Sequence, residues 1–382
     1  MADFGECESF CFAEVNLAHY AHNLAQIRVH LPQGAKILAV IKANAYGCGI
    51  AEIAKMACKC GVYALGVARM DEALIVRDAL IEARILILGY TPKELIETAI
   101  AHNIELCVYH KDIAEAISLE AQRQNKIAHI HIKIDTGMGR IGFLCDESNA
   151  NDSLNIVESI AKLPNIQIAG IFTHFSSADE SDLSYTQMQV RRYDDFIKAL
   201  ESCGITGFIR HCSNSAGIFS YPQGIFDMVR VGIVSYGISP IPQMPLKLKP
   251  VLSLKARVVH IKTLPKNYAI SYGRTFITPK TMRIATICAG YADGYSRLLS
   301  NKGEVLIRGK RAKVVGSVCM DQLCVDISDI KDAKIGDCAV LFGVDEWGNE
   351  ISPDELAQKI GTISYEIICA VSNRVPRIYK GV

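Results

Sequence analysis

The sequence has almost no net charge. Its 382 residues contain 41 Lys plus Arg and 40 Asp plus Glu, which gives a formal net charge of +1. This balance gives no electrostatic reason to expect nucleic acid or an anionic membrane surface as a partner. We therefore expect neither among the ligands of this protein.

Long apolar runs are also missing. No stretch of roughly twenty apolar residues is present that could span a bilayer. The segment Met1–Phe10 contains acidic and polar residues, whereas a signal peptide would have a basic start and an apolar run. Internal repeats and low-complexity segments do not stand out. These absences favour a cytoplasmic protein without a membrane partner.

The 14 cysteines lack the spacing of a metal site. Cys58 and Cys60 flank one lysine, and Cys7 and Cys11 are four residues apart, but neither pair belongs to a CxxC…CxxC set. A cytosolic chain keeps its thiols reduced, so most of these cysteines are expected to be small buried hydrophobic residues. We expect neither disulfides nor a bound metal.

What the sequence does contain is a regular alternation of short apolar runs and amphipathic segments. Helical patterns cover Asp71–Ala79, Pro92–Ala101, Asp112–Gln122 and Tyr185–Ser202. Continuous apolar runs followed by helices are typical of parallel strands buried on both faces. The runs are Lys36–Ile41, Tyr63–Ala68, Arg84–Gly89, Ile104–Tyr109, Ile130–Asp135, Ile166–Phe172, Gly207–His211 and Asp227–Gly232. They predict an α/β fold with an N-terminal (β/α)₈ TIM-type barrel. An open doubly wound sheet is the structural alternative.

After Ser239 the pattern changes. Four prolines punctuate a linker, and short strand-like runs follow with little helical periodicity until Pro353–Ile360. The expected strands are Val251–Ile261, Arg283–Ile287, Glu304–Ile307, Ala312–Val318 and Cys338–Phe342. We predict a barrel domain over residues 13–240 and a C-terminal β-rich domain over residues 241–382. We expect residues 1–12 to contribute a strand to that second domain.

Lys42 closes the first apolar run of the barrel. Active sites of such barrels form at the C-terminal ends of the strands. A lysine at this position is costly to bury, and burial lowers its pKa toward the neutral, nucleophilic amine. A neutral lysine can form a Schiff base with an aldehyde cofactor. A lysine whose side chain simply reaches solvent at the strand end is the structural alternative.

The fifth run leads into three glycines, Gly137, Gly139 and Gly142, which satisfy the GxGxxG pattern of dinucleotide-binding loops. Residues 143–153 have a loop-like composition, no helix begins at the glycines, and the unit is fifth rather than first in the chain. The pattern therefore fails its structural test. We instead expect a glycine-flexed loop that presents Arg140, whose planar guanidinium suits a carboxylate.

Polar residues also end the last three runs. His174 follows the sixth, Asn214 and Ser215 follow the seventh where a short helix would start, and Arg230 lies in the eighth. Backbone amides and small polar side chains at such a helix start can hold a phosphate. The loops after strands seven and eight are a frequent phosphate site of this fold. Each residue alone is more often structural, but together they indicate a site.

These motifs resemble the alanine racemase family, in its usual order and over nearly the whole chain. They are Lys42–Gly47 (KANAYG), Lys133–Gly142 (KIDTGMGRIG), Thr173–Phe175 (THF), Asn214–Ala216 (NSA), Ile270–Gly273 (ISYG), Gly290–Gly294 (GYADG), Cys319–Gln322 (CMDQ) and Val375–Ile378 (VPRI). Motifs of this length in both domains do not recur by chance.

The resemblance implies that Lys42 carries pyridoxal 5′-phosphate and acts as a base on one face of the substrate, while Tyr272 acts on the other. Two groups are needed because a single base tends to return its proton to the face from which it came. His174 would lie against the cofactor ring and assist Tyr272. Arg230 would pair with the ring nitrogen without donating a full proton, which discourages transamination.

The resemblance also implies further ligands. The family's phosphate ligands correspond to Tyr46, Asn214, Ser215, Gly232, Ile233 and Tyr365. Arg140 and Met320 correspond to the substrate-carboxylate site, and Lys133 to a lysine that can be carbamylated to anchor the arginine. Supporting roles fall to His211, Cys319 and Asp321.

One motif is repeated and two positions depart from the family. Tyr236 lies in a second Ser-Tyr-Gly, but it directly follows the last barrel run, so we assign catalysis to Tyr272. The family usually has histidine at Cys48, and proline or an aromatic residue at Val231. Both positions should affect rate or cofactor affinity rather than the reaction.

The resemblance implies an alanine racemase that interconverts L- and D-alanine and supplies D-alanine for bacterial peptidoglycan. It also implies a head-to-tail homodimer with shared active sites, because Tyr272 and Met320 lie in the β domain. The alternatives are a basic-amino-acid decarboxylase, a PLP-binding barrel protein and a broad-specificity racemase. A decarboxylase would not need a second base on the opposite face, so it leaves Tyr272 unexplained. A cofactor-binding barrel protein leaves the whole β domain unexplained. Broad-specificity racemases are usually exported, and no signal peptide is expected here.

Overall fold

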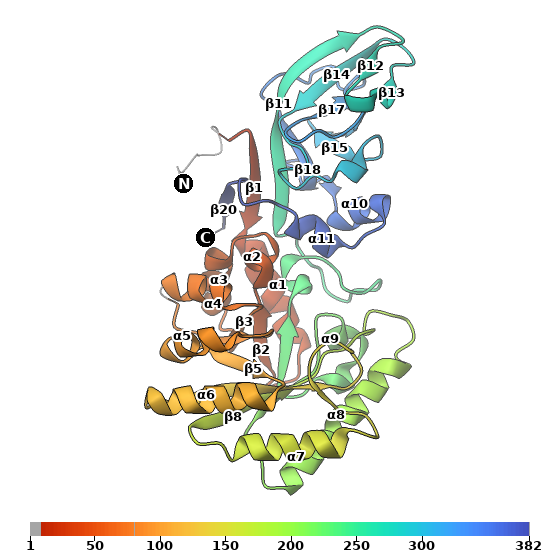
Figure 1. The fold of residues 1–382 in the computed structure, drawn as a ribbon. Coiled ribbons are helices and arrows are strands. Elements are labelled where there is room, and N and C mark those ends of the chain that lie inside the picture. The colour runs from red at the N-terminus through yellow and green to blue at the C-terminus, as the bar shows by residue number, and fades with distance from the viewer. Residues whose placement is uncertain (1–8, 80, 382) are drawn as a thin grey trace.

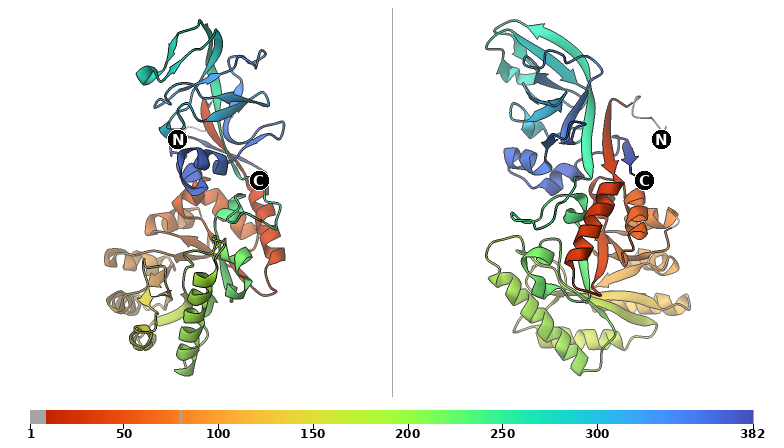
Figure 2. Two further views of the ribbon diagram at one scale, coloured as in Figure 1. Left: turned by 90° about the vertical axis from the view of Figure 1, so that its right-hand side faces the viewer. Right: turned by 180° about the vertical axis from the view of Figure 1, so that it is seen from behind.

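The computed structural model describes residues 9–79 and 81–381. Figure 1 shows an elongated molecule with a helix-covered barrel at one end and a β-rich part at the other. Two further views show the same two parts (Figure 2). No helix in the described part of the chain is long and apolar enough to cross a membrane.

Eight parallel strands form the barrel, as predicted. Their order is β10-β2-β3-β4-β5-β6-β8-β9, and a short strand, β7 (Phe143–Leu144), pairs with β6. The strands are β2 (Lys36–Val40), β3 (Ala64–Val67), β4 (Arg84–Ile87), β5 (Glu105–Val108), β6 (Ala128–Asp135), β8 (Ile166–Phe172), β9 (Ile209–His211) and β10 (Met228–Val231). Arg230 N–H donates to the Ser213 carbonyl at 3.0 Å across the remaining gap between β9 and β10. The barrel is nearly closed, which excludes the alternative of an open doubly wound sheet.

Helices surround this sheet and bury its outer face. They are α1 (Leu17–His30), α3 (Ile50–Lys59), α4 (Met70–Asp78), α5 (Ile96–Ala101), α6 (Lys111–Arg123), α7 (Ala150–Ala161) and α8 (Ser184–Ser202). The four predicted helices are present, although Pro92–Ala101 begins with a 3₁₀ turn, η1 (Lys93–Leu95). The loop prediction for residues 143–153 is wrong beyond Asn149. Helix α7 begins there because Ser153, Val157 and Ile160 recur at helical spacing and are buried.

The β-rich part is built around one long strand, β11 (Leu252–Leu264). The sheet order is β16-β15-β18-β11-β1-β20, and β14 pairs with both β11 and β17. The other strands are β1 (Cys11–Asn16), β14 (Met282–Ile287), β15 (Glu304–Ile307), β16 (Lys310–Lys313), β17 (Leu323–Asp326), β18 (Cys338–Val344), β19 (Glu350–Ile351), β20 (Arg377–Lys380) and the pair β12 (Ala269–Ile270) and β13 (Phe276–Ile277). The predicted strand Ala312–Val318 is wrong in its second half, because Gly316 turns the chain at φ +81°.

The start of the chain runs into this second sheet. Strand β1 pairs antiparallel with β11, from Cys11 opposite Ala256 to Val15 opposite Leu252. Of the N-terminal strand predicted over residues 1–12, the first eight residues lie outside the described ones. The boundaries of the two domains stay a prediction.

Two helices of the β-rich part lie at the junction with the barrel. They are α10 (Pro353–Ile360) and α11 (Ser364–Cys369), drawn between the two parts in Figure 1. Helix α11 packs on α2 (Lys42–Tyr46), which follows the C-terminal end of the first barrel strand. The end of the barrel where catalytic residues gather therefore faces the β-rich part.

Candidate active site

Lys42 begins an unusual segment. The next four residues, Ala43 to Tyr46, all have φ between +52° and +54°, so α2 is a left-handed helical turn. Its hydrogen bonds are regular, with Ala45 N–H donating to the Ile41 carbonyl at 2.8 Å. For L-residues the left-handed conformation costs roughly 1–2 kcal/mol per residue, so surrounding contacts must hold this turn in place.

Glu72, in the first turn of α4, provides such contacts. Its carboxylate accepts the backbone N–H of Ala43 at 2.6 Å and that of Ala68 at 2.8 Å. Glu72 is buried, so these charge-assisted bonds are shielded from water. The carboxylate ties the residue after Lys42 to the end of the neighbouring strand β3.

The Lys42 side chain borders an open cavity. It has accessible surface, yet protein atoms surround it closely enough that desolvation, together with the positive charge of Arg140, lowers its pKa. Glu72 opposes this shift only in part. The environment therefore favours the neutral amine, the nucleophilic form expected from the sequence.

Asp135 shapes the glycine loop that carries Arg140. One carboxylate oxygen accepts the N–H groups of Gly137, Met138 and Gly139 at 2.8–3.2 Å, and the other accepts the N–H of Arg140 at 3.1 Å. Burial opposes ionisation of Asp135, but these backbone donors outweigh it and lower its pKa. The loop thus winds around one carboxylate and presents Arg140 to the cavity.

Lys133 lies beside this loop with almost no exposed surface. Its Nζ donates to the Ile134 carbonyl at 2.7 Å and lies 5.6 Å from the centre of the Phe172 ring. Burial lowers its pKa to about 8, and the charge of Arg140 adds to this effect. A substantial neutral fraction is therefore present near neutral pH.

Arg230 is fixed by neighbouring strand ends. Its Nη1 donates to the His211 carbonyl at 2.8 Å, and its Nη2 donates to the carbonyls of Thr173 and Cys212, each at 2.7 Å. The ring nitrogens Nδ1 of His211 and His174 lie 3.2 Å and 3.0 Å from these terminal nitrogens. Among the residues that the structure describes, Nε of Arg230 has no hydrogen-bond acceptor. That N–H is left for a ligand.

His174 is neutral in this environment. Burial lowers its pKa well below the usual value, and the positive charge of Arg230 adds to this effect. Because a guanidinium only donates, Nδ1 of His174 must accept, and the proton resides on Nε2. The ring can then donate a hydrogen bond from its far nitrogen.

Small residues and hydroxyl groups line another part of the cavity. Ser215 Oγ accepts the N–H of Gly232 at 3.0 Å, and Asn214 Oδ1 accepts the N–H of Gly217 at 2.9 Å at the start of α9 (Gly217–Ser220). A Cβ at Gly232 would lie 2.6 Å from the hydroxyl of Tyr46, so only glycine fits there. Burial raises the pKa of Tyr46 and keeps its hydroxyl protonated as a donor.

The groups that could bind a ligand meet in one cavity of about 730 Å³. It brings together most of the predicted ligands: Lys42, Tyr46, Lys133, Arg140, His174, Asn214, Ser215, Arg230, Gly232, Ile233 and Tyr365. They fit pyridoxal phosphate. The chain offers an amine for the aldehyde, an unpaired Arg230 N–H for the ring nitrogen, and a hydroxyl-lined cradle at Gly232 for the phosphate.

The predicted residues of the β-rich part lie elsewhere. Tyr272 is 74% exposed and Met320 is 52% exposed, and neither lines the cavity in this chain. Asp321 pairs with Arg374 at 2.8 Å, and Cys319 Sγ lies 3.4 Å from Ser271 Oγ. Within one chain, half of the expected catalytic pair is thus separate from the other half.

Tyr236, the tyrosine of the repeated motif, is a core residue. It is 2% exposed, its hydroxyl donates to the Val40 carbonyl at 3.1 Å, and its ring packs on Tyr46. Cys48 and Val231, where the sequence departs from the family pattern, are fully buried, and neither lines the cavity.

Three carboxylates escaped the sequence reasoning. Asp135 was visible only as part of a glycine motif, although an acid followed by three N–H donors in a tight loop is a recognisable signal. Glu72 looked like an ordinary first-turn acid of a helix. Glu105 begins β5, and only the assembled barrel shows that it contacts His131.

Two family models match the chain. The alanine racemase N-terminal domain matches residues 15–240, and the C-terminal domain matches residues 251–379. An alanine racemase of Clostridium perfringens (strain SM101 / Type A) is 47% identical over 377 residues, which are 98% of this chain and 96% of the relative.

Solved structures agree with these matches. The alanine racemase of Clostridium difficile 630 has a TM-score of 0.91 at 40% identity and covers 97% of this chain and 96% of its own. The alanine racemase of Bartonella henselae with covalently bound pyridoxal phosphate has a TM-score of 0.87 at 28% identity, covering 97% and 100%. The chain belongs to the alanine racemase family.

Proposed function

We propose that this protein is an alanine racemase that interconverts L-alanine and D-alanine with pyridoxal phosphate. The observation that carries the proposal is the single cavity in which Lys42, Arg140 and Arg230 converge with the cradle at Gly232. Full-length similarity to alanine racemases supports the same reaction. The decarboxylase and the cofactor-binding barrel are disfavoured, because the chain matches both racemase domain models.

In this proposal Lys42 would hold the cofactor covalently, Arg230 would contact its ring nitrogen, and Ser215, Gly232 and Tyr46 would bind its phosphate. When bound, pyridoxal phosphate withdraws electrons from the substrate Cα and makes its hydrogen acidic. Arg230 remains charged and keeps its proton, because burial lowers its pKa only to about 10. An arginine therefore limits electron withdrawal and disfavours side reactions.

Two residues move the proton. Lys42, with its lowered pKa, removes or returns it on one face of Cα. Tyr272 acts on the other face as the second acid–base group. The Nε2–H of His174 is a suitable donor to the Tyr272 oxygen.

Arg140 binds the substrate carboxylate in this proposal. Lys133 would be carbamylated, which would replace two neighbouring positive charges by an ion pair. A carbamate forms from neutral amine and carbon dioxide, and the pKa of about 8 makes that amine available. Met320, with Cys319 and Asp321 beside it, would complete the carboxylate site.

A second copy of the chain would supply Met320 and Tyr272. Both are exposed in one chain and absent from its cavity. The active unit is therefore proposed to be a homodimer with two shared sites. A role in supplying D-alanine for peptidoglycan and a location in the cytoplasm stay predictions.

Product analysis tests the proposed reaction. The protein is incubated with pyridoxal phosphate and L-alanine, L-serine or L-lysine, and D-product is measured by chiral chromatography. We expect D-alanine in large excess over the other products. Equal rates with all three would indicate a broad-specificity racemase, and release of carbon dioxide from L-lysine would indicate a decarboxylase.

Spectroscopy tests the cofactor assignment separately. A lysine-bound pyridoxal phosphate absorbs near roughly 420 nm. We expect this band in the wild type and its loss in Lys42→Ala, with Lys36→Ala as the control because Lys36 begins the same strand at its opposite end. A band retained in Lys42→Ala would show that another residue holds the cofactor.

A further inference from the structure

A line of buried side chains crosses the barrel beneath the cavity. His131 Nε2 lies 2.8 Å from a carboxylate oxygen of Glu105, and His131 Nδ1 lies 3.0 Å from His211 Nε2. His211 Nδ1 in turn lies 3.2 Å from Nη1 of Arg230. All four residues are at most 6% exposed. We call Glu105, His131, His211 and Arg230 the buried relay.

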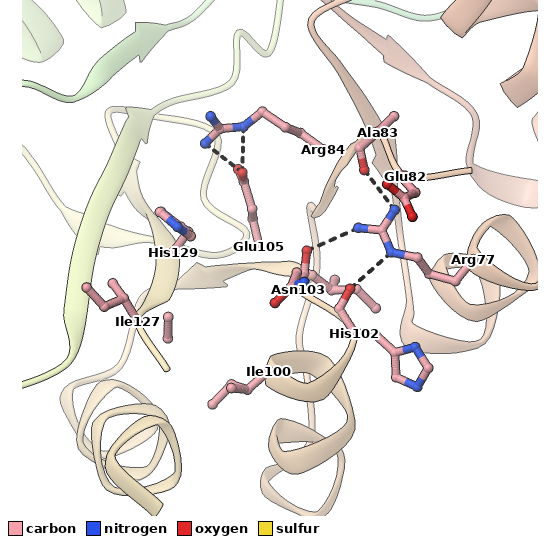
Figure 3. A pocket seen from close by; sticks show the side chains of 12 residues that line it. Arg77, Glu82, Ala83, Arg84, Ile100, His102, Asn103, Glu105, Ile127 and His129 are labelled. Atoms are coloured by element: carbon pink, nitrogen blue, oxygen red, sulfur yellow. Dashed lines mark hydrogen bonds and ion pairs between the residues drawn. The ribbon is translucent and has the colours of Figure 1, made fainter. Parts of the chain in front are cut away.

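The relay runs from one end of the barrel to the other. Glu105 is the first residue of β5, whereas His211 is the last residue of β9. At the end of the barrel where β5 begins, Glu105 also accepts hydrogen bonds from Nε and Nη2 of Arg84, each at 2.7 Å. This pair lines a polar pocket of about 500 Å³. Figure 3 shows this pair, with Arg77 bonded to backbone carbonyls nearby. The pocket contains none of the proposed catalytic or cofactor residues.

The hydrogen bonds of the relay can point in only one direction. Arg230 has donors only, so Nδ1 of His211 must accept and Nε2 must carry the proton. That proton is donated to Nδ1 of His131, which leaves the His131 proton on Nε2, directed at Glu105. Burial lowers the pKa of His211 well below its usual value, and the positive charge of Arg230 adds to this, so the ring is neutral. Each histidine therefore has one tautomer.

The carboxylate of Glu105 favours the same direction from the other end of the relay. Burial opposes ionisation of Glu105, but the hydrogen bond from His131, together with the charge and hydrogen bond of Arg84, lowers its pKa. An ionised carboxylate can only accept. A donor in its place would leave donors at both ends of the relay, and inversion of both histidines would then keep the contact with His131 but turn Nδ1–H of His211 toward the N–H of Arg230.

Gly170 in β8 keeps the His131 ring in position. A Cβ at this glycine would lie 2.3 Å from Nδ1 of His131, so the ring packs directly on the backbone. The close fit leaves the ring little freedom to turn, and the relay keeps its geometry through the barrel.

From this geometry we propose that Glu105 is a positioning residue for Arg230. It sets the tautomers of His131 and His211 and thereby holds the guanidinium with its Nε–H toward the cofactor cavity. This inference rests on the proposed function for the identity of the ligand. The arrangement of protons in the relay does not depend on it.

Glu105→Gln makes a sharp test because of Arg84. In this variant Arg84 would donate its hydrogen bonds to the oxygen of the introduced amide. The amide NH₂ would then face Nε2 of His131 as a donor, and both histidines would change tautomer. In Glu105→Gln with Arg84→Met, the amide is free to turn its oxygen toward His131. The double variant should therefore restore the relay, while Arg84→Met alone should leave it unchanged.

Histidine tautomers can be read directly. The ten histidines are labelled with ¹⁵N, and long-range ¹H–¹⁵N correlation spectra show which ring nitrogen carries the proton, with His131→Asn and His211→Asn as assignment variants. We expect Nε2–H for both rings in the wild type, Arg84→Met and the double variant, and Nδ1–H in Glu105→Gln. Wild-type tautomers retained in Glu105→Gln would overturn the proposal.

Cofactor binding gives the second readout. The dissociation constant of pyridoxal phosphate should rise about tenfold in Glu105→Gln, the scale of one disturbed buried hydrogen bond, and recover in the double variant. An equal rise in Arg84→Met would overturn the proposal, because it would trace the effect to the lost ion pair. Wild-type protein with the expected tautomers but no cofactor binding would overturn the proposed function and support the relay.

Discussion

At the scale of single residues, the site separates groups that do chemistry from groups that hold them. Lys42, Arg140 and Arg230 line the cavity. Glu72 accepts the N–H next to Lys42, Asp135 accepts the N–H of Arg140, and Glu105 contacts His131 at the far end of the buried relay from Arg230. A carboxylate is well suited to this task because each oxygen can accept more than one hydrogen bond. The supporting acids therefore fix positions without entering the cavity.

The two tyrosines of the repeated motif give a first prediction. Tyr272→Phe should lower racemisation by about 10²–10⁴-fold, the usual contribution of a general acid–base group. Tyr236→Phe should retain most activity and lose only about 1 kcal/mol of unfolding free energy, because it removes one buried hydrogen bond. Initial rates and denaturant unfolding measure both. Loss of activity in Tyr236→Phe alone would reverse the assignment.

Glu72 gives a second prediction. Glu72→Ala should lower the unfolding free energy by about 2 kcal/mol and weaken cofactor binding, because two charged hydrogen bonds to the backbone are lost. Asp71→Ala is the matched control, since Asp71 lies in the same first turn of α4 but is exposed. Similar effects in both variants, by denaturant titration, would assign the role to the helix end instead.

At the scale of elements, α10 connects the β-rich part to the cavity rim. Ser352 Oγ accepts the N–H of Glu355 at 3.1 Å, and Asp354, Ala357 and Gln358 line the cavity. Glu355 pairs with Arg311 at 2.6 Å and with Lys359 at 2.9 Å. The helix that borders the cavity is thus fixed by a cap and by a small ion network.

This network predicts a pH dependence. Hydrogen bonds from Arg311 lower the pKa of Glu355 to about 2 from its usual 4.5. The pairing therefore contributes stability above pH 4.5 and loses it as the pH falls from there toward 2. Arg311→Met should have a lower melting temperature than the wild type at pH 6, and the gap should narrow below pH 4.5. A constant gap down to pH 2, by calorimetry, would contradict this account.

Sequence periodicity predicted all eight barrel strands, because apolar runs buried on both faces differ clearly from the helices between them. It missed β17 and α11, which are too short to show a period. It also could not show that α2 is left-handed. Its residues KANAY favour an ordinary helix, and the contact with Glu72 that holds the turn is tertiary.

The residues of the candidate site that lie at the ends of barrel strands could be predicted from the sequence. Lys42, His174 and Arg230 could be placed in this way. The buried relay could not, because its members are far apart in the sequence and each resembles an ordinary core residue. The separation of Tyr272 from the cavity was inferred only from the resemblance. In the single chain the Tyr272 side chain is exposed.

At the scale of the whole molecule, the proposed dimer has a direct test. If Lys42 of one chain works with Tyr272 of another, then Lys42→Ala and Tyr272→Phe are each inactive alone. A mixed dimer has one site with both wild-type residues. Random exchange of equal amounts should restore about one quarter of wild-type activity. The recovered rate is measured after reversible dissociation.

The control for this experiment is the composition of the mixture. Native mass spectrometry counts the mixed dimers, and recovered activity should follow their number. Lys42→Ala mixed with Lys42→Ala/Tyr272→Phe should recover nothing. Abundant mixed dimers without activity would show that both residues act within one chain, and a monomer with full activity would rule out sharing.

The left-handed turn after Lys42 has a consequence for chemical synthesis. Mirror-image residues adopt positive φ without strain, so D-alanine suits the backbone at Ala43, whose side chain is exposed. A semisynthetic protein with D-alanine there should gain roughly 1–2 kcal/mol of unfolding free energy, whereas D-alanine at the right-handed Ala51 of α3 should lose a similar amount. The enzyme proposed to make D-alanine would then be stabilised by its own product within its backbone.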